Sequence, residues 1–468
     1  MSEEKSSAEL LAEKLRFKSN NAGQVLSDEE IIKADDFCEG YKAFLNSCKT
    51  ERECALFFRF FAEQNGFKEF DKDAKYSAGD KVYRLNRDKS LIVAVFGKRK
   101  ISEGVRIAAA HIDSPRIDLK PNPVYEDTEL ALFKTHYYGG IKKYQWTAIP
   151  LSLHGVVILS DGSKVNVTIG EKDDEPKFVI TDLLPHLAKE QMKKPLEEAI
   201  AGEDLNVLIG SRPFRSDKGS ELVKLNILNI LYEKYGMKEA DFLSAELELV
   251  PAFLSCDIGF DRSMIGSYGH DDRVCAYPSF MATVDCGVPE YTCVTVLTDK
   301  EETGSEGNTG LKSSYLRYFI EDLASLEGLS GRDVLSRSQC LSADVNAGFD
   351  PTYPSVLERM NAAFLNKGIV VTKFTGSRGK SGTSDASAEY VGRVRKIFDD
   401  AGIVWQMGEL GKVDAGGGGT VAMYIANLDV DVIDVGVPVL SMHSPFEVVS
   451  KLDVYMAFKA FKAFFLAP

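Results

Sequence analysis

Four apolar stretches of this 468-residue chain are each followed by side chains that bind metal ions in proteins. Imidazole and carboxylate together make a mixed nitrogen and oxygen ligand set, which suits Zn²⁺, Co²⁺ or Mn²⁺ better than Mg²⁺ or Ca²⁺. Because ligands gather beyond the carboxyl ends of strands in open α/β sheets, the four ends predict one shared metal site. The stretches and the residues after them are 106–110 with His111 and Asp113, 292–297 with Glu301 and Glu302, 339–343 with Asp344, and 432–440 with His443.

The same residues include a candidate general base. Of two adjacent glutamates, Glu301 and Glu302, one can bind a metal while the other accepts a proton from a metal-bound water. Asp113 is two residues beyond His111, where its carboxylate can accept the second N–H of the imidazole. Each residue type also has an ordinary structural role, so the spacing alone leaves a structural interpretation open. A fifth ligand candidate lies in the segment 269–273, which contains His270, Asp271 and Asp272.

The segments between these residues predict an α/β fold. Helical periodicity covers 7–18 and 29–63, with Ser27 as the cap of the second segment, and short β-like runs begin near residue 81. Strands and helices alternate again after residue 255, and the chain ends with a helical pattern over 449–465. Strand and turn patterns without that alternation fill the stretch between, which is typical of an inserted domain. We therefore predict a discontinuous domain of 1–117 and 255–468 with a β-rich insertion at 118–254.

Composition and charge narrow the class of protein. Hydrophobic residues make up 44% and charged residues 27% of the chain, as in globular proteins of two or three domains. A net charge of −14 and a pI near 5.1 argue against partners such as nucleic acid or a membrane surface. The polar first residues and the lack of a long apolar run predict a cytoplasmic protein. The eight cysteines include no C-x-x-C pair, so we expect reduced, structural thiols.

Five segments carry a more specific pattern: AHIDSPR at 110–116, HYYGG at 136–140, DKEETGSE at 299–306, SADVN at 342–346 and SMHSP at 441–445. In this order they closely resemble the aspartyl aminopeptidase/aminopeptidase I family of dinuclear zinc metallopeptidases. The resemblance implies a zinc-exopeptidase-like mixed sheet sandwiched by helices, with an inserted, mainly β dimerisation domain. It also implies two divalent metal ions per subunit, with Zn²⁺ as the expected metal and Co²⁺ or Mn²⁺ as alternatives.

The resemblance assigns a role to each candidate residue of the metal site. Two residues hold the first zinc ion, two others hold the second, one aspartate bridges both ions, and one glutamate is the general base. These residues are His111 and Asp344 for the first ion, Glu302 and His443 for the second, Asp271 as the bridge, and Glu301 as the base.

Further residues around the metals follow from the same resemblance. Asp113 is implied as a catalytic residue beside His111. His154 of the inserted domain is implied to reach over the active site of a neighbouring subunit, and Lys373 to contact substrate. A core histidine and a solvated lysine are the structural alternatives for these last two. The family's inserted domains pair subunits, and the pairs build a tetrahedral shell of twelve.

One segment departs from the aspartyl-type members of the family. They carry His-Ala-x-His-Pro after the metal-binding aspartate, whereas this chain reads Ala-Gly-Phe-Asp-Pro at 347–351. The departure favours the aminopeptidase I branch and adds a carboxylate, Asp350, to the substrate pocket. We therefore expect neutral or basic first residues to be cleaved best, unless Asp350 only caps the turn before Pro351. The glycine-rich segment 414–420 lacks the lysine of a phosphate-binding loop and indicates close backbone approach near the substrate.

These observations predict a metal-dependent aminopeptidase that releases N-terminal amino acids through a water activated by two zinc ions, with Glu301 as its base. Two alternatives remain open. A dinuclear amidase or deacylase of small N-acyl compounds would not require a free amine, and a non-catalytic scaffold would not require Glu301. The predicted partners are peptide substrates and further copies of the same chain.

Overall fold

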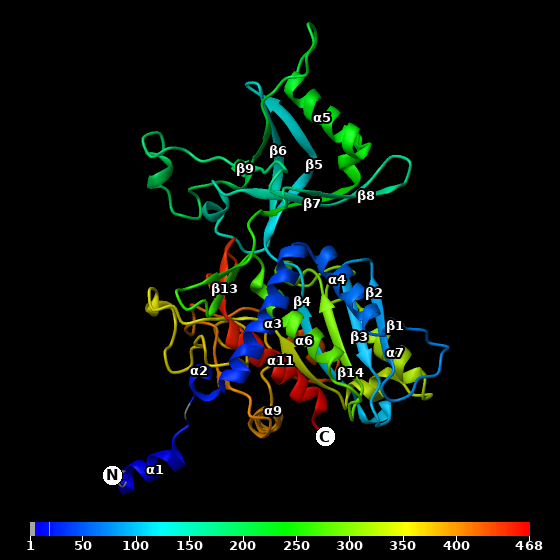
Figure 1. Cartoon of the computed structure of the whole chain (residues 1–468), viewed down its shortest axis with the longest axis vertical. Coiled ribbons are helices and arrows are strands. Elements are labelled where there is room, and N and C mark those ends of the chain that lie inside the picture. The colour runs from blue at the N-terminus through cyan, green and yellow to red at the C-terminus, as the bar shows by residue number, and fades with distance from the viewer. Residues whose placement is uncertain (1–4, 18) are drawn as a thin grey trace.

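A nine-stranded sheet forms the centre of the computed structural model, which describes residues 5–17 and 19–468 (Figure 1). Its four central strands, β14, β4, β15 and β19, run parallel, so their carboxyl ends lie at one edge. In spatial order the strands are β1 (Lys68–Glu69), β2 (Lys81–Asn86), β3 (Ser90–Val95), β14 (Cys293–Thr298), β4 (Arg106–His111), β15 (Gln339–Ala343), β19 (Asp431–Gly436), β17 (Ile369–Thr372) and β18 (Trp405–Met407).

Helices cover both faces of this sheet because alternate strand residues are apolar on each side. On one face Ala108 and Leu341 pack against five helices, and on the other Ile107 and Cys340 pack against three. The five are α3 (Asp28–Ser47), α4 (Glu51–Gln64), α6 (His270–Val284), α9 (Ala388–Asp400) and α11 (Lys451–Leu466). The three are α7 (Tyr315–Ser325), α8 (Gly331–Leu335) and α10 (Ala422–Ala426). This arrangement is the predicted mixed sheet between layers of helices.

A seven-stranded sheet lies above the first one in Figure 1 and has a hydrophobic core of its own. All its strands come from one continuous stretch, 116–251, and helix α5 (Leu222–Tyr235) packs beside them. A role for this part in dimerisation stays a prediction. In spatial order the strands are β8 (Lys164–Ile169), β7 (Leu151–Ile158), β11 (Ala245–Pro251), β5 (Arg116–Asp127), β6 (Leu130–Tyr138), β10 (Val207–Gly210) and β9 (Val179–Ile180).

A third, five-stranded sheet carries the last part of the predicted metal site. The sequence suggests one strand over 432–440, but the chain leaves the nine-stranded sheet after Gly436 and enters this smaller sheet at Pro438. An apolar run alone does not show that its two halves pair with different neighbours. The strands in order are β12 (Cys256–Ile258), β13 (Met264–Ser267), β21 (Glu447–Ser450), β20 (Pro438–Leu440) and β16 (Asn346–Ala347).

The N-terminal helices differ from the predicted pattern in one respect. The predicted helix over 29–63 is two helices, because Thr50 caps α4 with its side chain and exchanges hydrogen bonds with Glu53. Ser27 caps α3 as expected. Two shorter helices precede α3, namely α1 (Ser7–Leu15), which stands apart from the body in Figure 1, and α2 (Ala22–Val25). Among the helices that the structure describes, none has the length and apolar character needed to cross a membrane.

Candidate metal centre

The structure brings the predicted ligands together at the carboxyl edge of the nine-stranded sheet. His111 is the last residue of β4, Asp344 follows β15 directly, and Glu301 and Glu302 lie in a short turn after β14. Two overlapping groups have ligand atoms that all lie within 4.8 Å of one another. They are His111 with Glu301 and Asp344, and His111 with Asp271 and Glu302.

Asp271 lies between the two histidines of the cluster. Its Oδ1 is 3.1 Å from His111 Nε2, and its Oδ2 is 3.1 Å from His443 Nε2. Asp344 Oδ1 is 3.8 Å from the same nitrogen of His111, and Glu302 Oε2 is 3.4 Å from that of His443. A carboxylate with one oxygen toward each histidine has the arrangement of a bridging ligand, and it is Asp271, rather than the adjacent Asp272, that takes this position.

The electrostatics of the cluster fit divalent cations. Within residues 5–17 and 19–468 no lysine or arginine pairs with the clustered carboxylates, and the buried oxygens Asp271 Oδ1 and Glu302 Oε1 have no hydrogen-bond partner. Burial raises the pKa of Glu301 to about 7 and raises the pKa values of Glu302 and Asp344 well above their ordinary range. Burial also opposes ionisation of Asp271, but His111 and His443 outweigh it and hold the pKa of that carboxyl low. Cations at this cluster would offset the concentrated negative charge.

Asp113 contacts more residues of the site than the sequence predicts. Its carboxylate lies near His111 Nδ1, at 3.4 Å, while the Asp113 backbone oxygen is closer, at 3.0 Å. The same carboxylate accepts the backbone N–H groups of Glu301 and Glu302, at 3.1 and 3.2 Å. One buried side chain therefore fixes both the imidazole and the turn that carries the two glutamates.

Glu447 fixes the backbone of two other residues of the cluster, His443 and Asp271. Sequence analysis did not identify it. Its Oε1 accepts the backbone N–H of His443 at 2.7 Å, and its Oε2 accepts that of Asp271 at 3.1 Å. The side chain is buried at the start of β21. The only available signal was an acidic residue inside an apolar strand pattern, four positions after His443.

The seven-stranded sheet also contacts the metal cluster through the end of β6. The backbone oxygen of Gly140 accepts a hydrogen bond from His443 Nδ1 at 2.8 Å, which leaves Nε2 of that ring facing Asp271. The Tyr138 hydroxyl donates to Asp113 Oδ2 at 2.8 Å, and the Arg116 guanidinium lies 3.9 Å over the tyrosine ring. Residues 138–140 therefore orient groups on both sides of the cluster.

Two adjoining cavities surround the metal cluster. The first, of about 470 Å³, is lined by the clustered carboxylates and by polar residues of the central sheet. The second, of about 890 Å³, shares five lining residues with the first, so the two cavities adjoin. The shared residues are Gly140, Leu410, Gly417, Met442 and His443.

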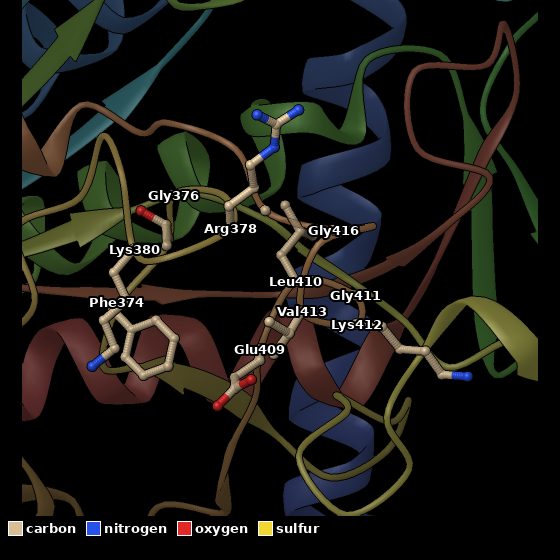
Figure 2. Close-up of a pocket in the computed structure, with 12 residues that line it drawn as sticks. Phe374, Gly376, Arg378, Lys380, Glu409, Leu410, Gly411, Lys412, Val413 and Gly416 are labelled. Atoms are coloured by element: carbon tan, nitrogen blue, oxygen red, sulfur yellow. The ribbon is translucent and has the colours of Figure 1, made fainter.

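The glycine-rich segment lies against both cavities. A Cβ atom at Gly417 would lie 1.7 Å from the backbone oxygen of Gly376, and the φ angle of Gly417 is +98°, so a side chain is excluded there. Figure 2 shows the two facing loops, with Phe374 and Lys380 on one and Leu410 on the other. The small cleft that they line has a volume of about 40 Å³. The segment thus packs closely against the backbone of Gly376, and its predicted position near the substrate stays a prediction.

Four other histidine, lysine and aspartate candidates lie outside the metal cluster. His154 is buried, with Nδ1 2.8 Å from Glu53 and Nε2 2.9 Å from Glu171. Burial lowers its pKa, but these two carboxylates outweigh burial and raise the pKa to about 9. Its predicted reach into a neighbouring subunit stays a prediction. Lys373 pairs with Asp385 at 2.8 Å and lines neither cavity.

Asp350 and His270 have local partners. Asp350 lines the larger cavity, and its Oδ1 accepts the N–H of Thr352 at 2.8 Å, as in the turn-capping alternative. His270 is buried and uses its two ring nitrogens on the Tyr41 hydroxyl and the Ile265 backbone oxygen. Burial lowers the pKa of His270 to about 3, so this ring is neutral and faces away from the metal cluster.

An α/β fold with two histidines and several carboxylates gathered beside a substrate-sized cavity defines a metal-dependent enzyme. The family model described as aminopeptidase I zinc metalloprotease (M18) matches residues 44–465, and the chain belongs to this family. It is therefore a zinc aminopeptidase, a hydrolase of peptide bonds, as the sequence predicted.

Relatives and solved structures of this family match almost the whole chain. A probable M18 family aminopeptidase 1 from Clostridium acetobutylicum is 48% identical over 452 residues, which cover 95% of this chain and 97% of the relative. The crystal structure of aminopeptidase I from that organism has a TM-score of 0.92 at 44% identity and covers 96% of this chain and 100% of its own. The crystal structure of an M18 aminopeptidase from Thermotoga maritima also has a TM-score of 0.92, at 41% identity. It covers 96% of this chain and 99% of its own. The S. cerevisiae mApe1 dodecamer shares the fold, with a TM-score of 0.73 at 20% identity. The match covers 92% of this chain and 96% of the mApe1 chain.

Proposed function

We propose that this enzyme releases N-terminal amino acids from peptides at a dinuclear zinc site. The position of Asp271, with one oxygen toward each of two histidines, carries the proposal, because it provides a bridge between two metal positions. His111 and Asp344 would hold one ion, and Glu302 and His443 the other. Zinc ions held there supply Lewis acidity toward the scissile carbonyl and lower the pKa of water. Co²⁺ and Mn²⁺ suit the same ligand set.

Glu301 acts as the general base. Its Oε2 is 3.9 Å from His111 Nε2, it lines the smaller cavity, and Asp113 fixes its backbone through the N–H. In this position Glu301 accepts a proton from the attacking water and delivers it to the leaving amine nitrogen. The bond between the carbonyl carbon and that nitrogen breaks, and the products are a free amino acid and the shortened peptide.

The first residue of the peptide occupies the smaller cavity. Its α-ammonium group lies among the clustered carboxylates, which confines cleavage to the N-terminus. Asp350 and Lys373 remain the proposed substrate-binding residues outside the cluster. Asp350 lines the cavity next to the one that holds the first residue, and its carboxylate disfavours an acidic first residue through like-charge repulsion.

Subunits assemble through the seven-stranded part of the chain, as dimers that build a twelve-subunit shell. Helix α5 supports this proposal, because Leu225, Ile230 and Tyr232 are exposed on it together with few charges. A dodecamer solved for the distant mApe1, which has the same fold, supports the proposal of twelve subunits.

A substrate panel tests the proposed function. Zinc-reconstituted protein is assayed with Leu-, Lys- and Asp-derived chromogenic amides and with their N-acetylated forms. We expect cleavage of free amines only, with the Leu or Lys substrate preferred over Asp. Equal cleavage of the acetylated forms would favour the amidase alternative, and a tenfold or greater preference for Asp would overturn the role of Asp350. Activity that survives Glu301→Gln unchanged would contradict the role of Glu301 as the base, and no hydrolysis of any of these substrates would favour the scaffold alternative.

A further inference from the structure

The larger cavity is the continuation of the metal cavity. The two share His443 and four other lining residues, so the larger space lies next to the end of the metal cavity. On its other side the metal cavity ends at the buried polar residues Asn346, Thr372 and Asp434 of the sheets. If the first residue of a peptide lies at the metals, the larger cavity is therefore the space, among the cavities described above, that can hold its remaining residues.

The walls of the larger cavity are mostly apolar. They come from both parts of the chain, because Leu196 and four residues near the end of β6 face the loops around 347–357 and 410–417. Those four are Gly140, Lys142, Tyr144 and Gln145. Apolar side chains of a bound peptide would be removed from water there. The apolar lining residues include Leu196, Val356, Leu357, Leu440 and Met442.

Lys142 supplies the positive charge of this cavity. It is the only lysine or arginine among the residues that line the cavity, and within the described parts of the chain no carboxylate is paired with it. It follows Gly140, whose backbone oxygen bonds His443, by two residues, a span of at most about 7 Å along the chain. Asp350, the other charged residue outside the metal cluster, is engaged by the N–H of Thr352.

We infer that this cavity is the subsite for the second and third residues of short peptides, and that Lys142 binds their terminal carboxylate. The inference rests on the proposed aminopeptidase function and adds a substrate class to it, namely dipeptides and tripeptides with a free carboxylate and an apolar second residue. An ammonium near a carboxylate gives a charge-assisted hydrogen bond, which an amidated peptide cannot form with the same strength.

A matched pair of lysine variants tests the inference. Lys142→Met is compared with Lys143→Met, because Lys143 does not line the cavity and its Nζ lies 5.9 Å from the centre of the Tyr137 ring. The substrates are Leu-Leu and Leu-Leu-Leu, each as the free acid and as the C-terminal amide. For the wild type and for Lys143→Met, we expect kcat/KM of the acids to exceed that of the amides about five- to tenfold, mainly through KM. In Lys142→Met this ratio should fall to near one.

The outcomes separate this inference from the proposed function. If the wild type hydrolyses Leu-Leu but does not distinguish the acid from the amide, or if Lys142→Met keeps the wild-type ratio, the assignment of Lys142 is wrong and the aminopeptidase function stands. If Leu-Leu and Leu p-nitroanilide are both inert with the zinc-loaded wild type, the proposed function itself fails. A faster reaction with Leu-Ser than with Leu-Leu would contradict the apolar character of the subsite.

Discussion

Replacing Glu447 with glutamine should weaken metal binding more than it weakens the fold. The carboxylate accepts the N–H groups of His443 and Asp271, at 2.7 and 3.1 Å. A glutamine side chain offers one oxygen, so its NH₂ group would face the second N–H and leave a buried donor without an acceptor. That loss costs about 1–3 kcal/mol. Because about 1.4 kcal/mol corresponds to a factor of ten, metal affinity should fall roughly 5- to 150-fold, which includes the range typical of residues that orient ligands.

The assay is a titration of metal-free protein with Zn²⁺ or Co²⁺ against a competing chelator, together with thermal unfolding of the metal-free form. Asp453→Asn is the matched control, because Asp453 is also buried and accepts two backbone N–H groups, from Asn366 and Gly368, both at 2.7 Å. Both variants should unfold at lower temperature than the wild type. Only Glu447→Gln should bind the metal more weakly.

Equal metal affinity in the wild type, Glu447→Gln and Asp453→Asn would refute this reasoning and make Glu447 a structural residue only. An equal loss of affinity in both variants would also refute it, because the loss would then follow from general destabilisation. If Glu447→Gln does not fold, Glu447→Asp is measured instead. It keeps the carboxyl group but is one methylene shorter, so it cannot reach both N–H groups and should show a smaller loss of the same kind.

Three further predictions concern the base, the buried histidine and the assembly. Glu301→Gln should retain its zinc while kcat falls by roughly 10²- to 10⁴-fold, and loss of zinc in metal analysis would show that Glu301 is a ligand instead. Protonated His154, with its pKa raised to about 9 between Glu53 and Glu171, should stabilise the fold fully below pH 6.5, and this stabilisation should disappear as the pH rises through 9. The melting-temperature difference between wild type and His154→Gln should therefore shrink over that range, and a constant difference would refute protonation. Light scattering should show an oligomer, and a fully active monomer would contradict both the assembly and the cross-subunit role of His154.

The sequence predicted which side chains would lie together, because the end of an apolar strand can be recognised in a sequence. His111 and Asp344 follow apolar runs directly, and Glu301 with Glu302 follows another, so parallel strands bring them to one edge. Asp271 was more difficult, since three polar residues in a row, including His270 and Asp272, offer similar chemistry. The choice came from the family resemblance, and the geometry places the same residue between the histidines.

The residues that hold these ligands in place were not predictable in the same way. Glu447 and Gly140 act through hydrogen bonds to or from groups far away in the sequence, which no local pattern reveals. His443 was found after the apolar stretch 432–440, but the second half of that stretch belongs to a different sheet from the strands before the other ligands. The strand that contains His154 was recognisable in the sequence. Its partners, Glu53 and Glu171, were not, because they come from separate elements.

The metal cluster depends on how three sheets are placed relative to one another. The nine-stranded sheet supplies His111 and Asp344, whereas the five-stranded sheet supplies Glu447 and leads into His443. Because Asp271 lies 3.1 Å from both His111 and His443, a small shift between the sheets would separate the two proposed metal positions. The buried carboxylate of Glu447 opposes that shift, since it bonds the backbones of Asp271 and His443 at once. The seven-stranded sheet adds a third constraint through Gly140, so contacts that move the end of β6 would reach the ligands without any change in the ligands themselves.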